Sequence, residues 1–422
     1  MHSTETEPIP TPHRWLVFSS ICLAYFFVYF HRVSTSVIVP DLLDAFHTDA
    51  AALGVMSSMY FYIYALEQPL VGYLTDRIGP RKVIGCWGLA AAAGCMIFGL
   101  AAGIGWASFG RALIGLGVGG VYVPAVKAFS QWFQKKEFAL MIGLLMSVGN
   151  LGAVIATTPL AWASDIWGWR STFFIIGGIT LAIACFTLAM TRDYPPASHS
   201  EALDAEKNID PSSGGTPAGL SIMASRQFWV IACIFFGIYG TLVTFQGLWA
   251  TPFLMTAFGI DRIYASKLNM LIPIGVIVGS PVIGWLSARL SWDKAKILMM
   301  ILLVYTLTWI GIIFFVGQLG TAGAGGVLLV MGAATGGFIS MLWSYIQERT
   351  STKMLGRISG MLNPAPFLGI AAFQMLTGAV LNRTDRSGDL YPMTGFKNAF
   401  ALCLVGIFAC FALSFFLKKS NN

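Results

Sequence analysis

Five ionisable side chains lie inside long apolar stretches of this 422-residue chain: His31, Arg32, Glu67, Arg111 and Lys127. A charge in the middle of a bilayer costs from about 3 to over 10 kcal/mol, so these residues are the first candidates for function. The arginine can bind a carboxylate or a phosphate through two parallel hydrogen bonds. The histidine and the glutamate are the side chains here that can carry a proton near neutral pH.

The segments that must position these groups are apolar runs of the length that crosses a bilayer, about 20 residues each. The sequence is 56% hydrophobic and 11% charged, whereas soluble proteins have about 25% charged residues. It therefore predicts an all-α membrane protein with twelve transmembrane helices. The twelve runs lie near 15–39, 51–74, 82–103, 106–133, 139–163, 171–191, 227–256, 263–289, 296–316, 321–346, 358–381 and 395–417.

A polar segment divides these runs into two groups of six. Residues 192–226 are rich in charged residues, proline, serine and glycine, which is typical of a solvated linker. We predict an N-terminal six-helix bundle over 1–191, a cytoplasmic linker over 192–226 and a pseudo-symmetric C-terminal bundle over 227–422. A weak repeat supports the symmetry, because residues 284–289 follow the eighth run as residues 72–77 follow the second. Proteins built in this way place their substrate site between the halves.

The distribution of charge predicts topology rather than a nucleic-acid partner. The net charge is +7, and most of the lysines and arginines fall in segments on one side of the predicted membrane. This bias places both termini in the cytoplasm. We expect no enzyme activity, cofactor or metal, because no nucleophile–base pair, metal-ligand spacing or phosphate-binding loop is present in the sequence. The expected partners are a small-molecule substrate, protons and the lipid bilayer, and we expect a monomer.

A charged loop between the second and third runs carries a specific signature. It reads Gly-Tyr-Leu-Thr-Asp-Arg-Ile-Gly-Pro-Arg-Lys over residues 72–82. This order resembles the loop signature G-x-L-x-D-R-x-G-x-R-K of the major facilitator superfamily. The resemblance implies a secondary transporter in which the loop acts as a gate on the cytoplasmic face, through Gly72, Asp76, Arg77, Gly79, Arg81 and Lys82.

Two further stretches resemble particular groups within that superfamily. The first run, Tyr-Phe-His-Arg-Val-Ser-Thr-Ser over residues 29–36, is similar to the first helix of the anion:cation symporters and the organophosphate:phosphate antiporters. That likeness implies that Arg32 contacts the anionic group of a substrate. Residues 111–119 resemble the R-x-x-x-G-x-x-G/A signature of the fourth helix, which implies that Arg111 faces the central cavity and helps couple protonation to movement.

The sequence also departs from these groups. The anion:cation symporters carry an acid seven residues after the fourth-helix arginine, where this chain has Val118. The phosphate antiporters carry a second arginine in the seventh helix, and residues 227–256 contain no cation. A phosphate clamp made by two arginines is therefore not expected.

The depth of each charge suggests its neighbours, at about 1.5 Å of rise per residue. Glu67 and Lys127 both fall on the inner side of the predicted membrane. One interpretation of these two charges is therefore that they form an ion pair. No acid in the N-terminal half matches the depth of Arg32, and Asp41, near the outer mouth, is the nearest candidate partner.

Candidate residues for substrate and proton follow from these observations. We expect proton coupling through His31, Glu67 and Arg111. We expect the substrate to contact Arg32, Tyr60, Tyr64, Lys127, Gln246, Trp249, Trp343 and Asn363.

The sequence as a whole predicts a secondary active transporter of a bacterial inner membrane. It favours proton-coupled symport, for uptake, of a small organic anion or zwitterion by alternating access. Two alternatives stay open: an importer of amino acids or nucleosides, and a proton-driven exporter of a metabolite, siderophore or drug.

Overall fold

The structure is a computed structural model that describes residues 11–193, 225–290, 292–350, 358–386 and 390–417. Its regular elements in these ranges are helices. The N-terminal half is defined here as α1 (Thr11–Val37), α2 (Val39–Ala45), α3 (Ala50–Ile78), α4 (Pro80–Leu100), α5 (Ile104–Gly119), α6 (Tyr122–Trp132), α7 (Lys135–Ile155) and α8 (Thr158–Met190).

The C-terminal half begins at Arg226 and contains one π-helical turn. Its elements are α11 (Arg226–Thr244), the π-helical turn η3 (Phe245–Trp249), α12 (Ala250–Phe258), α13 (Arg262–Asn269), α14 (Leu271–Leu290), α15 (Lys294–Phe314), α16 (Val316–Arg349), α18 (Pro364–Leu381) and α19 (Met393–Ser414).

Ten helical stretches of the described ranges are long and apolar enough to cross a membrane. They correspond to all the predicted runs except 51–74 and 139–163. The helix α3 has 29 residues, but its polar residues lower its hydropathy, and the apolar part of α7 is the shorter stretch Leu140–Ile155. That α3 and α7 also cross the membrane, which would give twelve transmembrane helices, therefore stays a prediction.

One predicted boundary, that of the run 139–163, is wrong, whereas the run 106–133 matches the candidate span Ile104–Trp132 despite a break inside it, and prolines lie near both breaks. The run 139–163 is interrupted, because α7 ends at Ile155 and α8 begins at Thr158 with Pro159 in its first turn. Proline is favoured there because its missing N–H has no helical partner at that position. The run 106–133 breaks between α5 and α6 at residues 120–121, where Pro124 cannot donate a hydrogen bond to the preceding turn.

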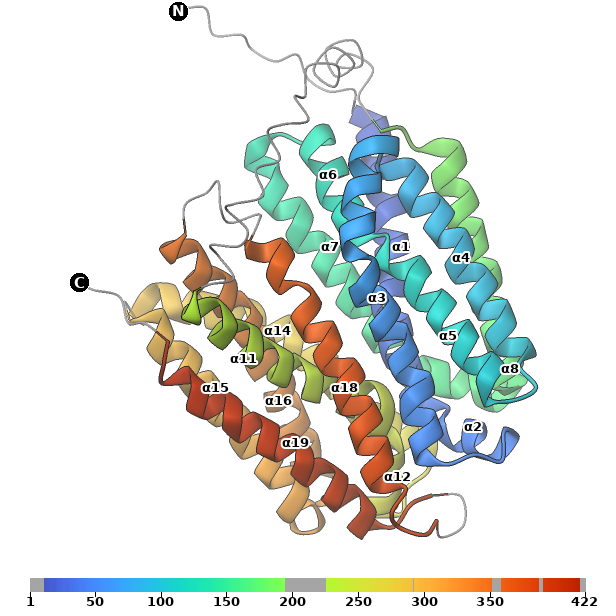
Figure 1. The fold of residues 1–422 in the computed structure, drawn as a ribbon, viewed down its shortest axis with the longest axis vertical. Helices are drawn as coiled ribbons and strands as arrows, with labels where there is room; N and C mark the ends of the chain where they lie inside the picture. Colours follow the sequence, from blue (N-terminus) through green and yellow to red (C-terminus); the bar gives the residue numbers. More distant parts are fainter. Residues whose placement is uncertain (1–10, 194–224, 291, 351–357, 387–389, 418–422) are drawn as a thin grey trace, which may run out of the picture.

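Contacts between the two halves run along several helices. Figure 1 shows the helices of the N-terminal half on one side, the C-terminal helices on the other, and α18 alongside α3. In addition, α1 contacts η3 and α12, and α7 contacts α14. Most of the predicted linker, 194–224, lies outside the described residues, so the domain boundaries stay a prediction.

Close helix packing depends on glycines at the contact points. A Cβ atom on Gly115 would overlap the backbone carbonyl oxygen of Tyr60, so α5 lies directly against α3. A Cβ atom on Gly378 would lie 2.5 Å from the carbonyl oxygen of Ala50, where α18 meets α3. Small residues allow such approach in membrane helices.

We expect Gly115→Ala to destabilise the protein by about 1 to 3 kcal/mol, because the added methyl forces α5 away from α3. The measurement is a thermal unfolding curve of the detergent-purified protein. Gly105→Ala, in the same helix but with open space around the new methyl, is the control. Equal melting temperatures for the two variants would contradict the packing argument.

Candidate functional site

A cavity of about 300 Å³ with a mixed polar and apolar lining lies between the two halves. It is lined from the N-terminal half by α1, α6 and α7, and from the C-terminal half by α11, η3, α14 and α16. Its polar or aromatic lining residues include Tyr29, Arg32, Asn150, Tyr239, Gln246, Ser340 and Trp343.

Arg32 is the charged centre of this cavity, and it is held by tyrosines from both halves. Its guanidinium donates hydrogen bonds to the hydroxyl of Tyr239 at 3.2 Å and to that of Tyr64 at 3.4 Å. It also lies over the rings of Tyr29, at 4.4 Å, and Phe367, at 5.1 Å. Cation–π contacts of this kind stabilise a desolvated cation without neutralising it.

No carboxylate among the described residues lies within ion-pair distance of Arg32. The predicted partner Asp41 instead pairs with Arg262 of α13. Arg32 therefore presents an uncompensated positive charge to the cavity, and its Nε atom has no partner. Such a group can bind an anion that enters the cavity.

The predicted ion pair between Glu67 and Lys127 is wrong. Lys127 forms an ion pair with Asp76 at 2.9 Å and donates to the carbonyl of Thr75 at 3.0 Å. The reason is depth, because Asp76 lies nine residues beyond Glu67 on α3, about 14 Å along the helix. Lys127 is thus withdrawn from the cavity.

Glu67 is buried and has a neutral partner. Its Oε2 atom accepts a hydrogen bond of 2.9 Å from the indole N–H of Trp87. Its Oε1 atom has no hydrogen-bond partner and lies against Gly119, where any larger residue would collide with it. The ring of Tyr64, one turn before Glu67, faces the same glycine. Tyr64 therefore lies between the carboxyl group and Arg32.

The other predicted substrate residues divide into two groups. Gln246 and Trp343 line the cavity. Tyr60 donates to the carbonyl of Val28 at 2.9 Å, Trp249 donates to Thr377 at 2.9 Å, and Asn363 donates to Gln68 at 3.3 Å. None of these last three donors lines the cavity in this conformation.

Arg111 does not face the central cavity, contrary to the expectation. It is fully buried, and both of its terminal nitrogens donate to the carbonyl oxygen of His31 at 3.1 Å. Its guanidinium lies 4.9 Å from the ring centre of Tyr60. The His31 side chain packs nearby, with Nε2 3.7 Å from the sulfur of Cys95. Arg111 thus joins α5 to α1 inside the N-terminal half.

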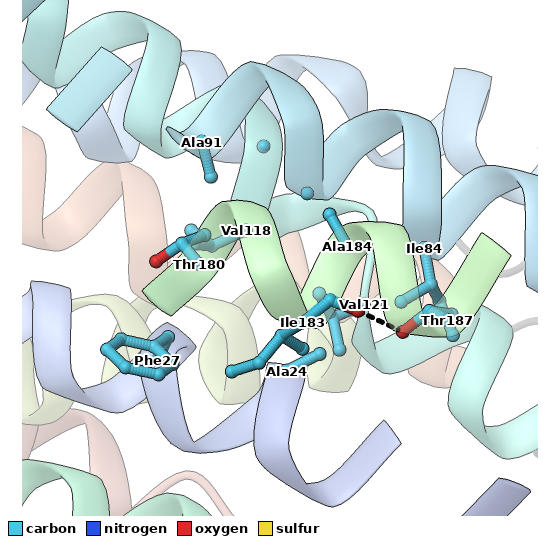
Figure 2. Close-up of a pocket in the computed structure, with 12 residues that line it drawn as sticks. Ala24, Phe27, Ile84, Ala91, Val118, Val121, Thr180, Ile183, Ala184 and Thr187 are labelled. Atoms are coloured by element: carbon cyan, nitrogen blue, oxygen red, sulfur yellow. Dashed lines mark hydrogen bonds between the residues drawn. The ribbon is translucent and has the colours of Figure 1, made fainter. Parts of the chain in front are cut away.

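The position of Val118 explains why an acid is missing there. Figure 2 shows Val118 beside a second, much smaller cavity of about 20 Å³, lined by apolar side chains such as Phe27 and Ile183. This void lies among α1, α4, α5 and α8, within the N-terminal half. A carboxylate at position 118 would be buried among mainly apolar groups, which is costly.

The loop over residues 72–82 contacts the N-terminal half and Asp193, which follows that half in the chain. Asp76 binds Lys127, and Arg77 donates to the hydroxyl of Tyr73 at 2.7 Å. The backbone N–H of Arg81 donates to Asp193 at 2.7 Å, and its side chain donates to the carbonyl of Leu188. Gly79 adopts a φ of 87°, which favours glycine. Gly72 has open space beside it, and Lys82 is exposed.

An ion-pair network joins the halves near the start of α13. Arg262, at the start of α13, binds both Asp41 of α2 and Asp165 of α8. Burial raises the pKa of Asp41, and the neighbouring guanidinium opposes that rise. One cation of the C-terminal half is therefore held by two carboxylates of the N-terminal half.

Sequence reasoning missed part of the cavity wall. Tyr29 could have been found, because it lies one helical turn before Arg32 on the same face. Asn150, Tyr239 and Ser340 carry no local signal, because they reach the cavity only when the halves are brought together.

A helical membrane protein whose two halves enclose a cavity with a buried arginine has the architecture of a solute transporter rather than an enzyme. The chain belongs to the Major Facilitator Superfamily, whose sequence profile matches residues 21–374. This agrees with the signature over residues 72–82.

Curated relatives are transporters as well. The chain is 26% identical to the probable sulfoacetate transporter SauU of Cupriavidus necator, over 66% of this chain and 65% of that relative. It is 22% identical to the hexuronate transporter of Escherichia coli, over 87% of each chain.

Solved structures share the fold at low identity. A bacterial homologue of the human lysosomal transporter Spinster, in an inward-facing and unoccupied conformation, has a TM-score of 0.74 at 17% identity and covers 96% of this chain and 97% of its own. The nucleoside transporter NupG has a TM-score of 0.75 at 13% identity, covering 97% of this chain and 100% of its own.

We expect Arg262→Gln to loosen the outer contact between the halves, because two carboxylates lose their shared cation. Hydrogen–deuterium exchange of peptides from α2 and α13 should become faster. Lys267→Gln removes a positive charge from an exposed position of the same helix, so its exchange should match the wild type. Unchanged exchange in Arg262→Gln would show that the network does not hold the two halves together at this end.

Proposed function

We propose that this protein takes up a small organic anion by proton-coupled symport, with its two halves rocking around the central cavity. The observation that carries the proposal is the buried guanidinium of Arg32, which faces the cavity with hydroxyl and aromatic partners but no ion-pair partner in the described ranges. A carboxylate or sulfonate would supply the missing counter-charge and accept two hydrogen bonds.

The composition of the cavity supports a small anion of low charge. Arg32 is the one lysine or arginine among the residues that line it in the described structure, and Lys127 is bound to Asp76 instead. Amide and hydroxyl groups of Asn150, Gln246 and Ser340 can bind the polar body of such a ligand. Relatives named for sulfoacetate and hexuronate, both organic anions, agree with this chemistry.

Glu67 is the proposed main proton carrier. One of its oxygens has no hydrogen-bond partner and the other binds the neutral indole of Trp87, so protonation of the carboxyl group leaves no buried cation without a counter-ion. The hydroxyl of Tyr64, one helical turn before Glu67, accepts a hydrogen bond from Arg32, so a bound anion that replaces Tyr64 at the guanidinium would release this hydroxyl. His31 is the second candidate carrier. Arg111 would follow any movement of His31, since it binds that residue's carbonyl.

The network around Arg262 supports an assignment of this conformation as closed on the outer side. We propose that the loop over residues 72–82 closes the opposite face when the halves rock. The bias of positive charge supports cytoplasmic termini. We further propose a bacterial inner membrane as the location and a monomer as the working unit.

Arg32→Ala should weaken anion binding about 10- to 100-fold, because a charge-assisted hydrogen-bond pair is lost. The measurement is isothermal titration with a panel of carboxylates and sulfonates. Lys127→Gln is the matched control, since it removes a cation that lies outside the cavity, and it should bind as the wild type does. Normal binding by Arg32→Ala would remove this residue from the site.

Glu67→Gln should abolish proton-driven accumulation in proteoliposomes but retain exchange of substrate across the membrane, because the variant can still rock without carrying a proton. Asp44→Asn, an exposed position on α2, serves as the control for loss of one acid. If Glu67→Gln still accumulates substrate against a gradient when a pH difference is applied, another residue carries the proton.

A further inference from the structure

A second large groove lies on the outer surface of the C-terminal half, between α14, α15 and α16. Its volume is about 260 Å³, and its lining is apolar apart from Ser287. Residues that form it include Leu286, Trp292, Met300, Val304, Val330 and Ala333.

This groove is separate from the transport cavity. The cavity uses Pro273, Val276 and Ser280 of α14, whereas the groove uses residues from Ile283 onward. Trp292 is 48% exposed and Met300 is 51% exposed, so large apolar side chains stay uncovered by the protein. In a membrane protein such a surface is in contact with lipid, and a groove in it can hold one acyl chain.

Two cations that do not line the groove lie one helical turn from residues that do. Arg289 lies one turn after Leu286 on α14, and Lys296 lies one turn before Met300 on α15. The Arg289 guanidinium lies 4.8 Å from the ring centre of Trp285. Neither cation has an ion-pair partner among the described residues.

The acids nearby are already occupied. Glu348 binds Lys294 at 2.5 Å, and Asp293 binds Arg349 at 3.7 Å. The pair Arg289 and Lys296 therefore adds positive charge that these carboxylates do not neutralise. An anionic group at the end of the groove would meet two available cations.

The depth of Arg289 in the membrane suits an interaction with a lipid head group. Arg262, at the start of α13, joins the two halves at one membrane surface, and α14 follows α13 directly. The helix α14 has 20 residues, which corresponds to about 30 Å of length and thus to the thickness of the hydrocarbon core. Arg289 near its other end therefore lies at the opposite membrane surface.

We propose that this groove binds one anionic phospholipid, with an acyl chain between α14 and α16 and its phosphate held by Arg289 and Lys296. The charge complementarity favours phosphatidylglycerol over the zwitterionic phosphatidylcholine. Basic residues near an anionic lipid surface each contribute enough to change binding about five-fold. The site is independent of the transported substrate.

The test is native mass spectrometry of the full-length protein in detergent, titrated with phosphatidylglycerol or phosphatidylcholine of the same chain length. The wild type should retain phosphatidylglycerol preferentially. Arg289→Gln should weaken this binding about five-fold, and the double variant with Lys296→Gln about 30-fold. Val330→Trp should reduce binding by filling the groove while leaving both cations in place.

Arg226→Gln is the matched control. Its guanidinium also lies over an aromatic ring, at 4.6 Å from the centre of Phe416, but it is away from the groove. This variant should bind phosphatidylglycerol as the wild type does. Equal retention of both lipids by the wild type, or an equal loss in Arg226→Gln and Arg289→Gln, would overturn the proposal. The proposal would also be overturned if the lipid-free protein formed a dimer that Val330→Trp dissociates. That result would assign the groove to a second copy of the chain.

Discussion

A guanidinium buried in a membrane protein has to be stabilised, and the way in which Arg32 is stabilised decides what the cavity can do. A carboxylate from the protein would neutralise it and remove its value for binding. In the described structure its partners are instead tyrosine hydroxyls and aromatic rings, which lower the cost of burial and leave the charge in place. Because Tyr239 belongs to the C-terminal half, this charge also links the two halves at the cavity.

The other charges are arranged so that they do not compete with this centre. Lys127 and Asp76 pair at one membrane surface, and Arg262 pairs with Asp41 and Asp165 at the other. Ion pairs at the two surfaces stay partly hydrated, so their burial costs less than it would at the midplane. In the described structure, Arg32 is thus a buried cation without an ion pair, and Glu67 is a buried carboxyl group without one.

The separation of Glu67 from Lys127 has a functional consequence. A buried acid bound to a lysine would be held in its charged form, because protonation would leave a buried cation unpaired. The partner of Glu67 is the neutral indole of Trp87, which can donate to the carboxyl group in either state. Gly119 leaves room for the carboxyl group beside α5. The packing of α3 against α5 therefore decides whether this acid can serve as a proton carrier.

The sequence by itself determined the class of protein, because long apolar runs and a charged loop of fixed residue order are local features. It also identified Arg32, since a charge inside an apolar run is conspicuous wherever the helix packs. It could not determine which charged groups form ion pairs. The suggested pairing of Glu67 with Lys127 was wrong, and so was that of Asp41 with Arg32. The expectation that Arg111 faces the cavity was wrong as well. Depth along a helix does not give the rotation of that helix or the break between α5 and α6. Only the tertiary structure sets the rotation and the breaks of the helices. The rotation of each helix depends on where its small residues pack against a neighbouring helix and on which groups its charges pair with.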